Sequence, residues 1–152
     1  MKIRVEAPPS KEDIEQYAPF LVELLVAENG AVRAEDVDLS YVKRLLSSGN
    51  IIVFSAWDES VLAGAALISM SHLWYNPALV CAKDLIVWTA PSYRRTGVGS
   101  ALIAEIEDYA RERGCSQVFL SQSTGIDTEG TQRLYKELGY DVVGFLSNKR
   151  IA

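Results

Sequence analysis

Cysteine and histidine are scarce in this sequence. Two cysteines, Cys81 and Cys115, and one histidine, His72, occur among 152 residues. Two cysteines do not make a disulfide framework, and structural zinc sites use four cysteine or histidine ligands. We therefore expect neither a disulfide-rich secreted fold nor a metal centre. Cys81 lies in an apolar stretch with no histidine nearby in sequence, so we predict that it packs in the core rather than accepting an acyl group.

Long apolar runs and an excess of basic residues are also missing. No run approaches the roughly 18 apolar residues of a transmembrane helix, and residues 1–13 lack the apolar core of a signal peptide. The 15 Lys and Arg residues are outnumbered by 20 Asp and Glu residues, which gives a net charge of −5. Nucleic-acid surfaces need clustered cations. We therefore expect a cytoplasmic protein that binds neither a membrane nor a nucleic acid.

The remaining composition is that of an ordinary globular domain. Hydrophobic residues make up 49% of the chain, enough for a sizeable core, so we predict one domain over residues 1–152. A first helix is expected after Ser10 and is expected to end at residues 28–30, with Pro19 kinking or splitting it. A second helix is predicted between a cap at Asp38 and residues 48–50.

Alternating and apolar runs predict the strands. They are expected at Lys2–Glu6, Ile51–Trp57, Val61–Met70, Leu79–Trp88, Ser116–Leu120, Tyr140–Phe145 and Ser147–Ile151. Gly64 indicates a bulge, Ser71–Pro77 is predicted to be a loop, and Thr128 or Thr131 is expected to start the last helix. This order favours an α/β fold with a mixed sheet and helices on both faces.

The stretch from Asp84 to Gly114 organises this pattern. An apolar strand is ended by Pro91, a basic glycine loop follows, and apolar residues recur at helical spacing from Val98 onward. The helix is expected to end at Gly114, a residue typical of C-terminal caps. A strand, a glycine loop and a helix N-terminus together can form an anion site.

The loop itself reads Arg-Arg-Thr-Gly-Val-Gly over residues 94–99. Unpaired N–H groups at a helix start attract phosphate, and glycine lets the backbone approach it closely. A plain turn with solvated arginines is the alternative. A Walker loop would need a Gly-Lys-Ser/Thr sequence, and a dinucleotide fingerprint would need glycine where Leu102 stands.

Residues 94–99 resemble the R/Q-x-x-G-x-G/A loop of the GCN5-related N-acetyltransferases, the GNAT family. Thr89–Tyr93 resembles the V-x-P-x-x segment before that loop, and Leu134–Tyr140 resembles the family's L-Y-x-x-L-G-F segment. The resemblance implies an α/β fold with a mixed, mainly antiparallel central sheet of six to seven strands flanked by about four helices. It also implies that residues 1–152 form a single acetyltransferase domain.

The resemblance further implies acetyl-CoA as cosubstrate and no metal. The loop would hold the pyrophosphate through Arg94, Arg95, Thr96, Gly97, Val98 and Gly99, with backbone N–H groups from Arg95 through Gly99. The main chain at Val87 and Thr89 would pair with pantetheine in a gap between Asp84–Thr89 and Val118–Gln122. Thr128 stands where the family often has an asparagine, so it is a cofactor-binding candidate without the amide.

Acetyl transfer to an amine requires a base for the amine proton and a donor for the departing thiolate. Tyr135 matches the family tyrosine often given the second role, although it also lies on an apolar helical stripe typical of core residues. For the base, several members of the family have a carboxylate at the position of Lys83. Asp84 is adjacent but should face the other side of the sheet unless a bulge intervenes. His72 and a water-mediated route are alternatives.

The leading hypothesis is an N-acetyltransferase that moves an acetyl group directly from acetyl-CoA to a primary amine. A small-molecule or peptide amine is favoured over a nucleic acid because of the acidic net charge. The alternatives are a non-catalytic acyl-CoA-binding module, in which Lys83 marks a lost base, and a nucleotide or phosphate binder with coincidental motifs. The loop around His72, Trp74 and Tyr75 is an acceptor wall, a subunit contact or plain surface, so a homodimer stays open.

Overall fold

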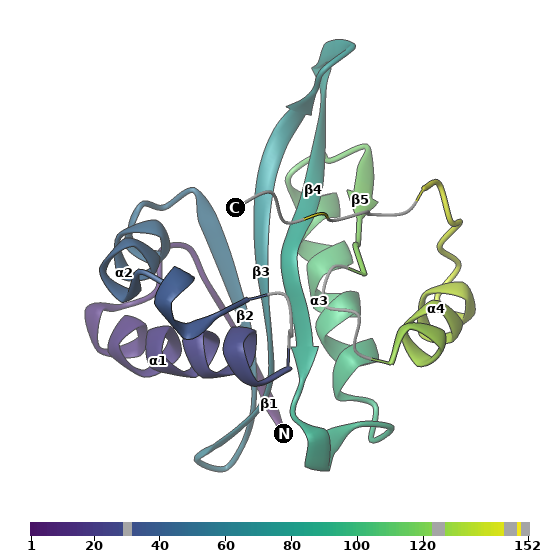
Figure 1. The fold of residues 1–152 in the computed structure, drawn as a ribbon. Coiled ribbons are helices and arrows are strands. Elements are labelled where there is room, and N and C mark those ends of the chain that lie inside the picture. Colours follow the sequence, from purple (N-terminus) through teal and green to yellow (C-terminus); the bar gives the residue numbers. More distant parts are fainter. Residues whose placement is uncertain (29–31, 123–126, 145–148, 150–152) are drawn as a thin grey trace.

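A computed structural model describes residues 1–28, 32–122, 127–144 and 149 (Figure 1). The elements follow in the order β1 (Lys2–Glu6), α1 (Lys11–Glu28), a 3₁₀ turn (Ala34–Asp36), α2 (Leu39–Ser47), β2 (Ile51–Asp58), β3 (Val61–Leu73), β4 (Asn76–Thr89), a second 3₁₀ turn (Pro91–Tyr93), α3 (Val98–Glu112), β5 (Gln117–Phe119) and α4 (Thr128–Glu137).

The strands form one mixed sheet in the order β1-β2-β3-β4-β5. The first four strands are antiparallel neighbours, and β5 runs parallel to β4 after the crossover through α3. Helices α1 and α2 lie on one side of the sheet, and α3 and α4 lie on the other (Figure 1). The predicted α/β class and the four helices are confirmed.

The predicted number of six to seven strands is wrong for the described residues, which form a sheet of five. Residues 141–144 of the expected strand Tyr140–Phe145 are irregular. Residues 145–148 and 150–152, where most of the remaining strand prediction falls, lie outside the described part of the chain.

Each face of the sheet has its own core. Alternate strand residues such as Val53 and Leu67 pack with α1 and α2, whereas Phe54 and Ile68 pack with α3. Period-two alternation thus supplies both helix layers from the same strands. Burying one such side chain stabilises the fold by about 1.5–3 kcal/mol.

Helix α1 runs without a break through Pro19, so the predicted split is wrong. Proline removes one backbone N–H from the helix, but packing on both sides of Pro19 holds the helix together. The Tyr17 hydroxyl donates to Glu6 Oε2 at 2.6 Å and lies 3.0 Å from Ser55 Oγ. The Phe20 ring packs edge-on against Trp88, with ring centroids 4.6 Å apart.

Gly64 brings the start of α3 directly onto the sheet. A Cβ at this position would lie 2.8 Å from the Trp88 carbonyl oxygen and 2.9 Å from Val98 Cγ1, closer than real contacts allow. The predicted bulge is confirmed, because the register between β2 and β3 shifts beside the pair of Ala56 and Gly64. The absence of a side chain at Gly64 therefore lets the N-terminus of α3 approach β3 closely.

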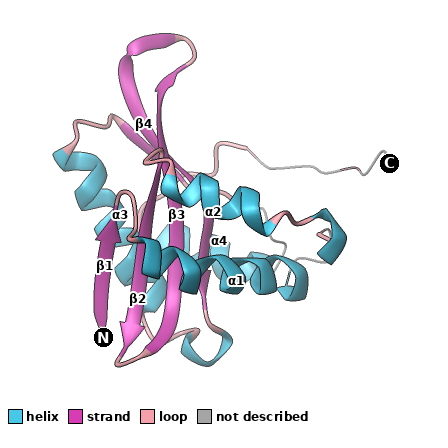
Figure 2. Cartoon of the chain, turned by 90° about the vertical axis from the view of Figure 1, so that its left-hand side faces the viewer, coloured by secondary structure: helices cyan, strands magenta, loops and turns pink. Residues whose placement is uncertain are grey.

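Strands β3 and β4 are longer than the sequence indicates. Ser71–Pro77 was expected to be a loop, yet β3 reaches Leu73 and β4 begins at Asn76, so only Trp74 and Tyr75 turn the chain. The hairpin end projects beyond the other elements (Figures 1 and 2).

Among the described residues, no helix has both the length and the apolarity needed to cross a membrane. Within the same ranges, no three His, Cys, Asp or Glu side chains gather where a metal ion could be held.

Candidate active site

Strands β4 and β5 separate at the centre of the molecule. Their parallel pairing covers Cys81–Lys83 opposite Gln117–Phe119 and ends there. Strand β4 continues to Thr89, whereas β5 ends at Phe119. Beyond the pair of Lys83 and Phe119, β4 has no strand beside it on this side among the described residues. We call this unpaired edge of β4, Asp84–Thr89, the gap, because the sequence predicts the cosubstrate gap along it.

The main chain of β4 points into this gap at alternate residues. The N–H of Ala90 donates to the carbonyl oxygen of Ala63 on β3 at 2.9 Å. Because N–H and C=O groups alternate between the two sides of a strand, Val87 and Thr89 direct theirs toward the gap. The Nε of Arg94 donates to the Thr89 carbonyl oxygen at 3.3 Å, which agrees with that direction. The predicted register of Val87 and Thr89 thus fits a ligand added alongside β4.

The basic loop ends at the first turn of α3. Gly97 precedes the helix with φ of +91°, a left-handed conformation that favours glycine. Arg95 is also left-handed, with φ of +65°. The N–H groups of Val98, Gly99 and Ser100 belong to the first turn, so the helix itself cannot satisfy them. A helix start of this kind can bind an anion, and phosphate binding by this loop stays a prediction.

One predicted donor of this loop is already used. The N–H of Thr96 donates to the Tyr93 carbonyl oxygen at 3.3 Å, which closes the turn after the short 3₁₀ segment. A pyrophosphate would therefore compete with the Tyr93 carbonyl oxygen for this N–H, and the role predicted for the N–H groups from Arg95 through Gly99 stays a prediction.

The two sequence motifs meet at Gly99. A Cβ on this glycine would lie 3.4 Å from Leu134 Cδ2 of α4 and 3.4 Å from Thr89 Oγ1 of β4. The start of α3, the end of β4 and the middle of α4 therefore pack together, and a Cβ at Gly99 would be in van der Waals contact with both neighbours. This contact places α4, with the adjacent Tyr135, beside the gap.

A bulge at Leu85 shifts the alternation of β4 next to the gap. Ile68 of β3 pairs with Asp84, but the preceding Leu67 pairs with Ile86, so one residue of β4 is left over. The Asp84 carboxylate accepts a bond from Ser121 N at 2.8 Å and one from Ser121 Oγ at 3.2 Å. The side chain of Asp84 therefore bridges the gap to the segment after β5.

Tyr135 reaches the same serine from α4. Its hydroxyl donates to the Ser121 carbonyl oxygen at 3.1 Å, and its side chain is buried. Asp84 and Tyr135, which are distant in sequence, thus meet at Ser121 through three hydrogen bonds. Sequence reasoning missed Ser121, because it is one polar residue at the start of a polar loop.

Burial raises the pKa of both Asp84 and Tyr135. It raises the pKa of Asp84 to about 6, although the two hydrogen bonds from Ser121 act in the opposite direction. Burial also raises the pKa of Tyr135 above its usual range, with a smaller contribution from the Asp84 charge. A carboxyl group that titrates near neutrality suits a base, and the tyrosine keeps its proton at neutral pH.

Lys83 and Thr128 do not join this cluster. Lys83 is exposed, and its Nζ lies 5.8 Å from the centroid of the Phe119 ring. Thr128 is the first residue of α4 and is exposed, and the helix is capped by Asp127, whose carboxylate accepts from Gly130 N at 3.1 Å. A cofactor contact at Thr128 stays a prediction.

The alternative base and the apolar cysteine lie elsewhere. His72 pairs with Val80 in the projecting hairpin, four residues along β3 from the partner of Asp84. At about 3.3 Å per residue this is roughly 13 Å away. Cys81 is fully buried and donates from Sγ to the Ser71 carbonyl oxygen at 3.3 Å, as expected of a packing residue.

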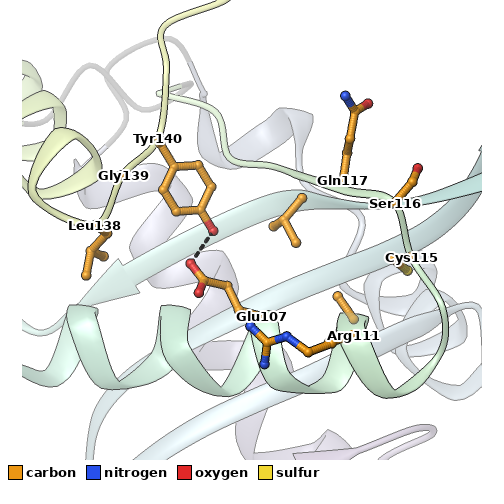
Figure 3. Close-up of a pocket in the computed structure, with 10 residues that line it drawn as sticks. Glu107, Arg111, Cys115, Ser116, Gln117, Leu138, Gly139 and Tyr140 are labelled. Carbon is orange, nitrogen blue, oxygen red and sulfur yellow. Dashed lines mark hydrogen bonds between the residues drawn. The ribbon is translucent and has the colours of Figure 1, made fainter.

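A separate cavity of about 320 Å³ is lined by α3, by β5 and the turn before it, and by the segment after α4 (Figure 3). The Tyr140 hydroxyl donates to Glu107 Oε1 across it at 2.8 Å. No residue of β4 lines this cavity, so it is distinct from the gap.

Known proteins provide independent information on the family. The model of the Acetyltransferase (GNAT) family matches residues 18–140. The aminoglycoside N(6')-acetyltransferase type 1 of Salmonella typhimurium is 24% identical over 112 residues, which cover 70% of this chain and 74% of that protein.

Solved structures share the fold. An aminoglycoside acetyltransferase from an uncultured soil metagenomic sample has a TM-score of 0.75 and 19% identity, with 100% of both chains covered. The aminoglycoside N-acetyltransferase AAC(6')-Iy, in complex with CoA, has a TM-score of 0.71 and 20% identity, with 99% of both chains covered. At these sequence identities the similarity is one of fold alone.

Proposed function

The chain belongs to the acetyltransferase (GNAT) family, and we propose that it transfers the acetyl group of acetyl-CoA directly to the primary amine of a small molecule. The observation that carries the proposal is the meeting of Asp84 and Tyr135 at Ser121, at one end of the gap. The phosphate-type loop at residues 94–99 lies at the other end. On this proposal, Asp84 of β4 and Tyr135 of α4 supply the base and the proton donor at one end of β4, and the loop before α3 supplies the anion site at the other end.

The residues along the gap fit acetyl-CoA. The first-turn N–H groups of α3, with Arg94 and Arg95 beside them, would hold the pyrophosphate. The main chain of Val87 and Thr89 would pair with the pantetheine amides, as in the addition of a strand to a sheet edge. When bound, acetyl-CoA supplies an activated acetyl thioester. The CoA complex of the structural neighbour AAC(6')-Iy supports this assignment.

Asp84 would accept the proton that the amine must lose. An ammonium group has no free electron pair, so the amine attacks only after a base has removed that proton, directly or through one water. The carboxylate is partly buried and already fixed by Ser121, so its orientation costs little at the moment of reaction.

Tyr135 would donate a hydrogen bond, and then a proton, to the departing sulfur as the C–S bond of the thioester breaks, and it would regain a proton from solvent before the next turnover. An ordinary thiol has a pKa of about 8.5. Because the pKa of Tyr135 is raised, its hydroxyl is protonated throughout the neutral range. The hydroxyl now donates to the Ser121 carbonyl oxygen and would exchange this bond for one to the sulfur.

We favour a small amine as acceptor. The curated relative is named for aminoglycosides, which are small polyamines, and the net charge of −5 favours cationic acceptors through long-range steering. The test is a competition assay with acetyl-CoA in which polyamines, aminoglycosides, amino acids, basic peptides and aminoacyl-tRNA are offered together. We expect the acetylated product to be a small amine, identified by mass spectrometry. Acetylation of the tRNA-borne amine alone would contradict the acceptor class and leave the enzyme class standing.

The raised pKa of Asp84 predicts a pH profile. A base must be deprotonated, so kcat/KM is expected to fall about tenfold per pH unit below roughly pH 6. The hydrogen bond from Ser121 Oγ lowers the pKa of Asp84. Ser121→Ala removes this bond, so the pKa of Asp84 should rise. The acidic limb of the profile, the pH range in which kcat/KM falls, should therefore shift to higher pH.

The control for this limb is Asp84→Asn, which should abolish it together with most of the activity. Asp58 is a carboxylate outside the gap that accepts from the Tyr93 hydroxyl at 3.0 Å, and Asp58→Asn should keep the wild-type limb. An acidic limb that persists unchanged in Asp84→Asn would remove Asp84 as the base.

A further inference from the structure

The end of the β3–β4 hairpin extends beyond its neighbours in the sheet. Pairing of β2 with β3 stops at Ser69, and pairing of β5 with β4 begins at Cys81. We call the segment between them, residues 70–80, the arm. Within the described ranges, its strands pair with each other, and the Val80 carbonyl oxygen also accepts from Ser116 N at 2.8 Å. Figures 1 and 2 show the arm projecting past the helices.

The arm exposes large apolar side chains. Trp74 is 92% exposed, Tyr75 is 60% exposed and Leu79 is 37% exposed. The two aromatic rings pack edge-on with centroids 5.5 Å apart, so they form one platform. Single exposed apolar residues are ordinary, but a cluster of them at the tip of a projecting ribbon is typical of an interaction surface.

The charge distribution favours a second copy of this chain as the partner. The whole chain carries a net charge of −5, so two copies repel each other over most of their surfaces. Residues 70–80 contain no Asp, Glu, Lys or Arg. The arm is therefore a place where two copies can approach without like charges meeting.

The backbone of the arm is also self-complementary. Beyond Ser69, the outer edge of β3 has no strand beside it among the described residues, so its N–H and C=O groups are open to pairing. A two-fold axis brings two identical edges together in antiparallel register, which satisfies both. A lipid surface offers no such pairing.

The available area is sufficient for a weak dimer. Aromatic side chains bury roughly 150–250 Å² each, so Trp74, Tyr75 and Leu79 supply on the order of 400 Å² per copy. With the backbone of the paired edges, two copies would bury about 1,000 Å² in total, at the lower limit of specific interfaces. A dissociation constant in the micromolar range is therefore expected.

We propose that the arm is a self-association surface through which two copies of this chain form a two-fold dimer. The proposal does not depend on the acetyltransferase activity. It gives a role to Trp74 and Tyr75, which have none in the candidate active site.

Sedimentation equilibrium of the full chain from about 1 to 500 µM tests it. The wild type should change from monomer to dimer within this range, and Trp74→Ser/Tyr75→Ser should weaken dimerisation at least tenfold. Tyr41→Ser is the matched control, because Tyr41 is 56% exposed on α2, away from the arm, and should dimerise like the wild type. Acrylamide quenching of tryptophan fluorescence should decrease with concentration in the wild type and not in the arm variant.

All variants change exposed side chains, and circular dichroism will verify that they are folded. A wild type that stays monomeric at 500 µM would overturn the proposal. Dimerisation unchanged by the arm variant would do so as well, and so would binding of the arm to neutral lipid vesicles by a monomer.

Discussion

Tyr135→Phe is expected to lower turnover by roughly 10²- to 10⁴-fold, the usual contribution of one general acid–base group. The substitution keeps the buried ring and its contact with Tyr140, whose centroid lies 5.8 Å away, and removes only the hydroxyl. Without the hydroxyl, the departing sulfur loses its donor. CoA affinity should change little, because the anion site lies at the other end of the gap. Initial rates of thiol release and calorimetric titration with CoA measure the two quantities.

Tyr140→Phe is the matched control. Its hydroxyl has a raised pKa, as does that of Tyr135, because of burial and the bond to Glu107, but it faces the separate cavity (Figure 3). Turnover of this variant should stay within a few-fold of the wild type. Wild-type turnover in Tyr135→Phe would return Tyr135 to a purely structural role in the core.

Gly99→Glu is expected to reduce CoA affinity by roughly 100-fold or more. The glutamate would start from a Cβ already 3.4 Å from Leu134 Cδ2 and Thr89 Oγ1, at the second residue of α3, which puts a carboxylate close to the first turn of the helix. A carboxylate there repels phosphate and competes for the same N–H groups, each of which is worth about 1.5–3 kcal/mol to a charged ligand. Calorimetry with CoA measures the loss.

Gly99→Ala is the control for Gly99→Glu. It shows how much of the lost CoA affinity comes from replacing glycine alone, without the charge and size of the glutamate side chain. Its Cβ makes only tight van der Waals contact, so the affinity should fall by less than tenfold. Both variants should keep the helical circular dichroism of the wild type. Undiminished CoA affinity in Gly99→Glu would exclude the phosphate role of this loop.

Local signals in the sequence were sufficient to predict the strand, the turn and the helix that would form the proposed anion site. Pro91 ended the strand, Gly97 allowed the left-handed turn and the apolar stripe after Val98 fixed the helix, all within about 25 residues. The cap at Asp38 was likewise local, and its carboxylate accepts from Tyr41 N at 3.0 Å. Such features depend on neighbouring residues and are therefore readable in one sequence.

The proposed catalytic cluster of Asp84, Ser121 and Tyr135 depends on contacts that no local pattern contains. The bulge at Leu85 is defined by pairing with β3, and it lies after Asp84, so Lys83 and Asp84 still face opposite sides of the sheet. Ser121 acquires its role because β5 leaves β4 and α4 returns beside it. Pro19 shows the converse, since a local rule for breaking a helix was overridden by the packing around Tyr17 and Phe20.

A single-turnover reaction tests the central claim most directly. Enzyme in excess over acetyl-CoA is mixed with an accepted amine, quenched over time, and analysed by mass spectrometry for acetylated amine, free CoA and acetylated protein. Direct transfer predicts that acetylated amine and free CoA appear in equal amounts at the same rate, with no acetylated protein. Acetyl-CoA that is bound but stays intact with every amine would instead identify a non-catalytic binding module, and an acetyl group on the protein before the amine reacts would contradict direct transfer.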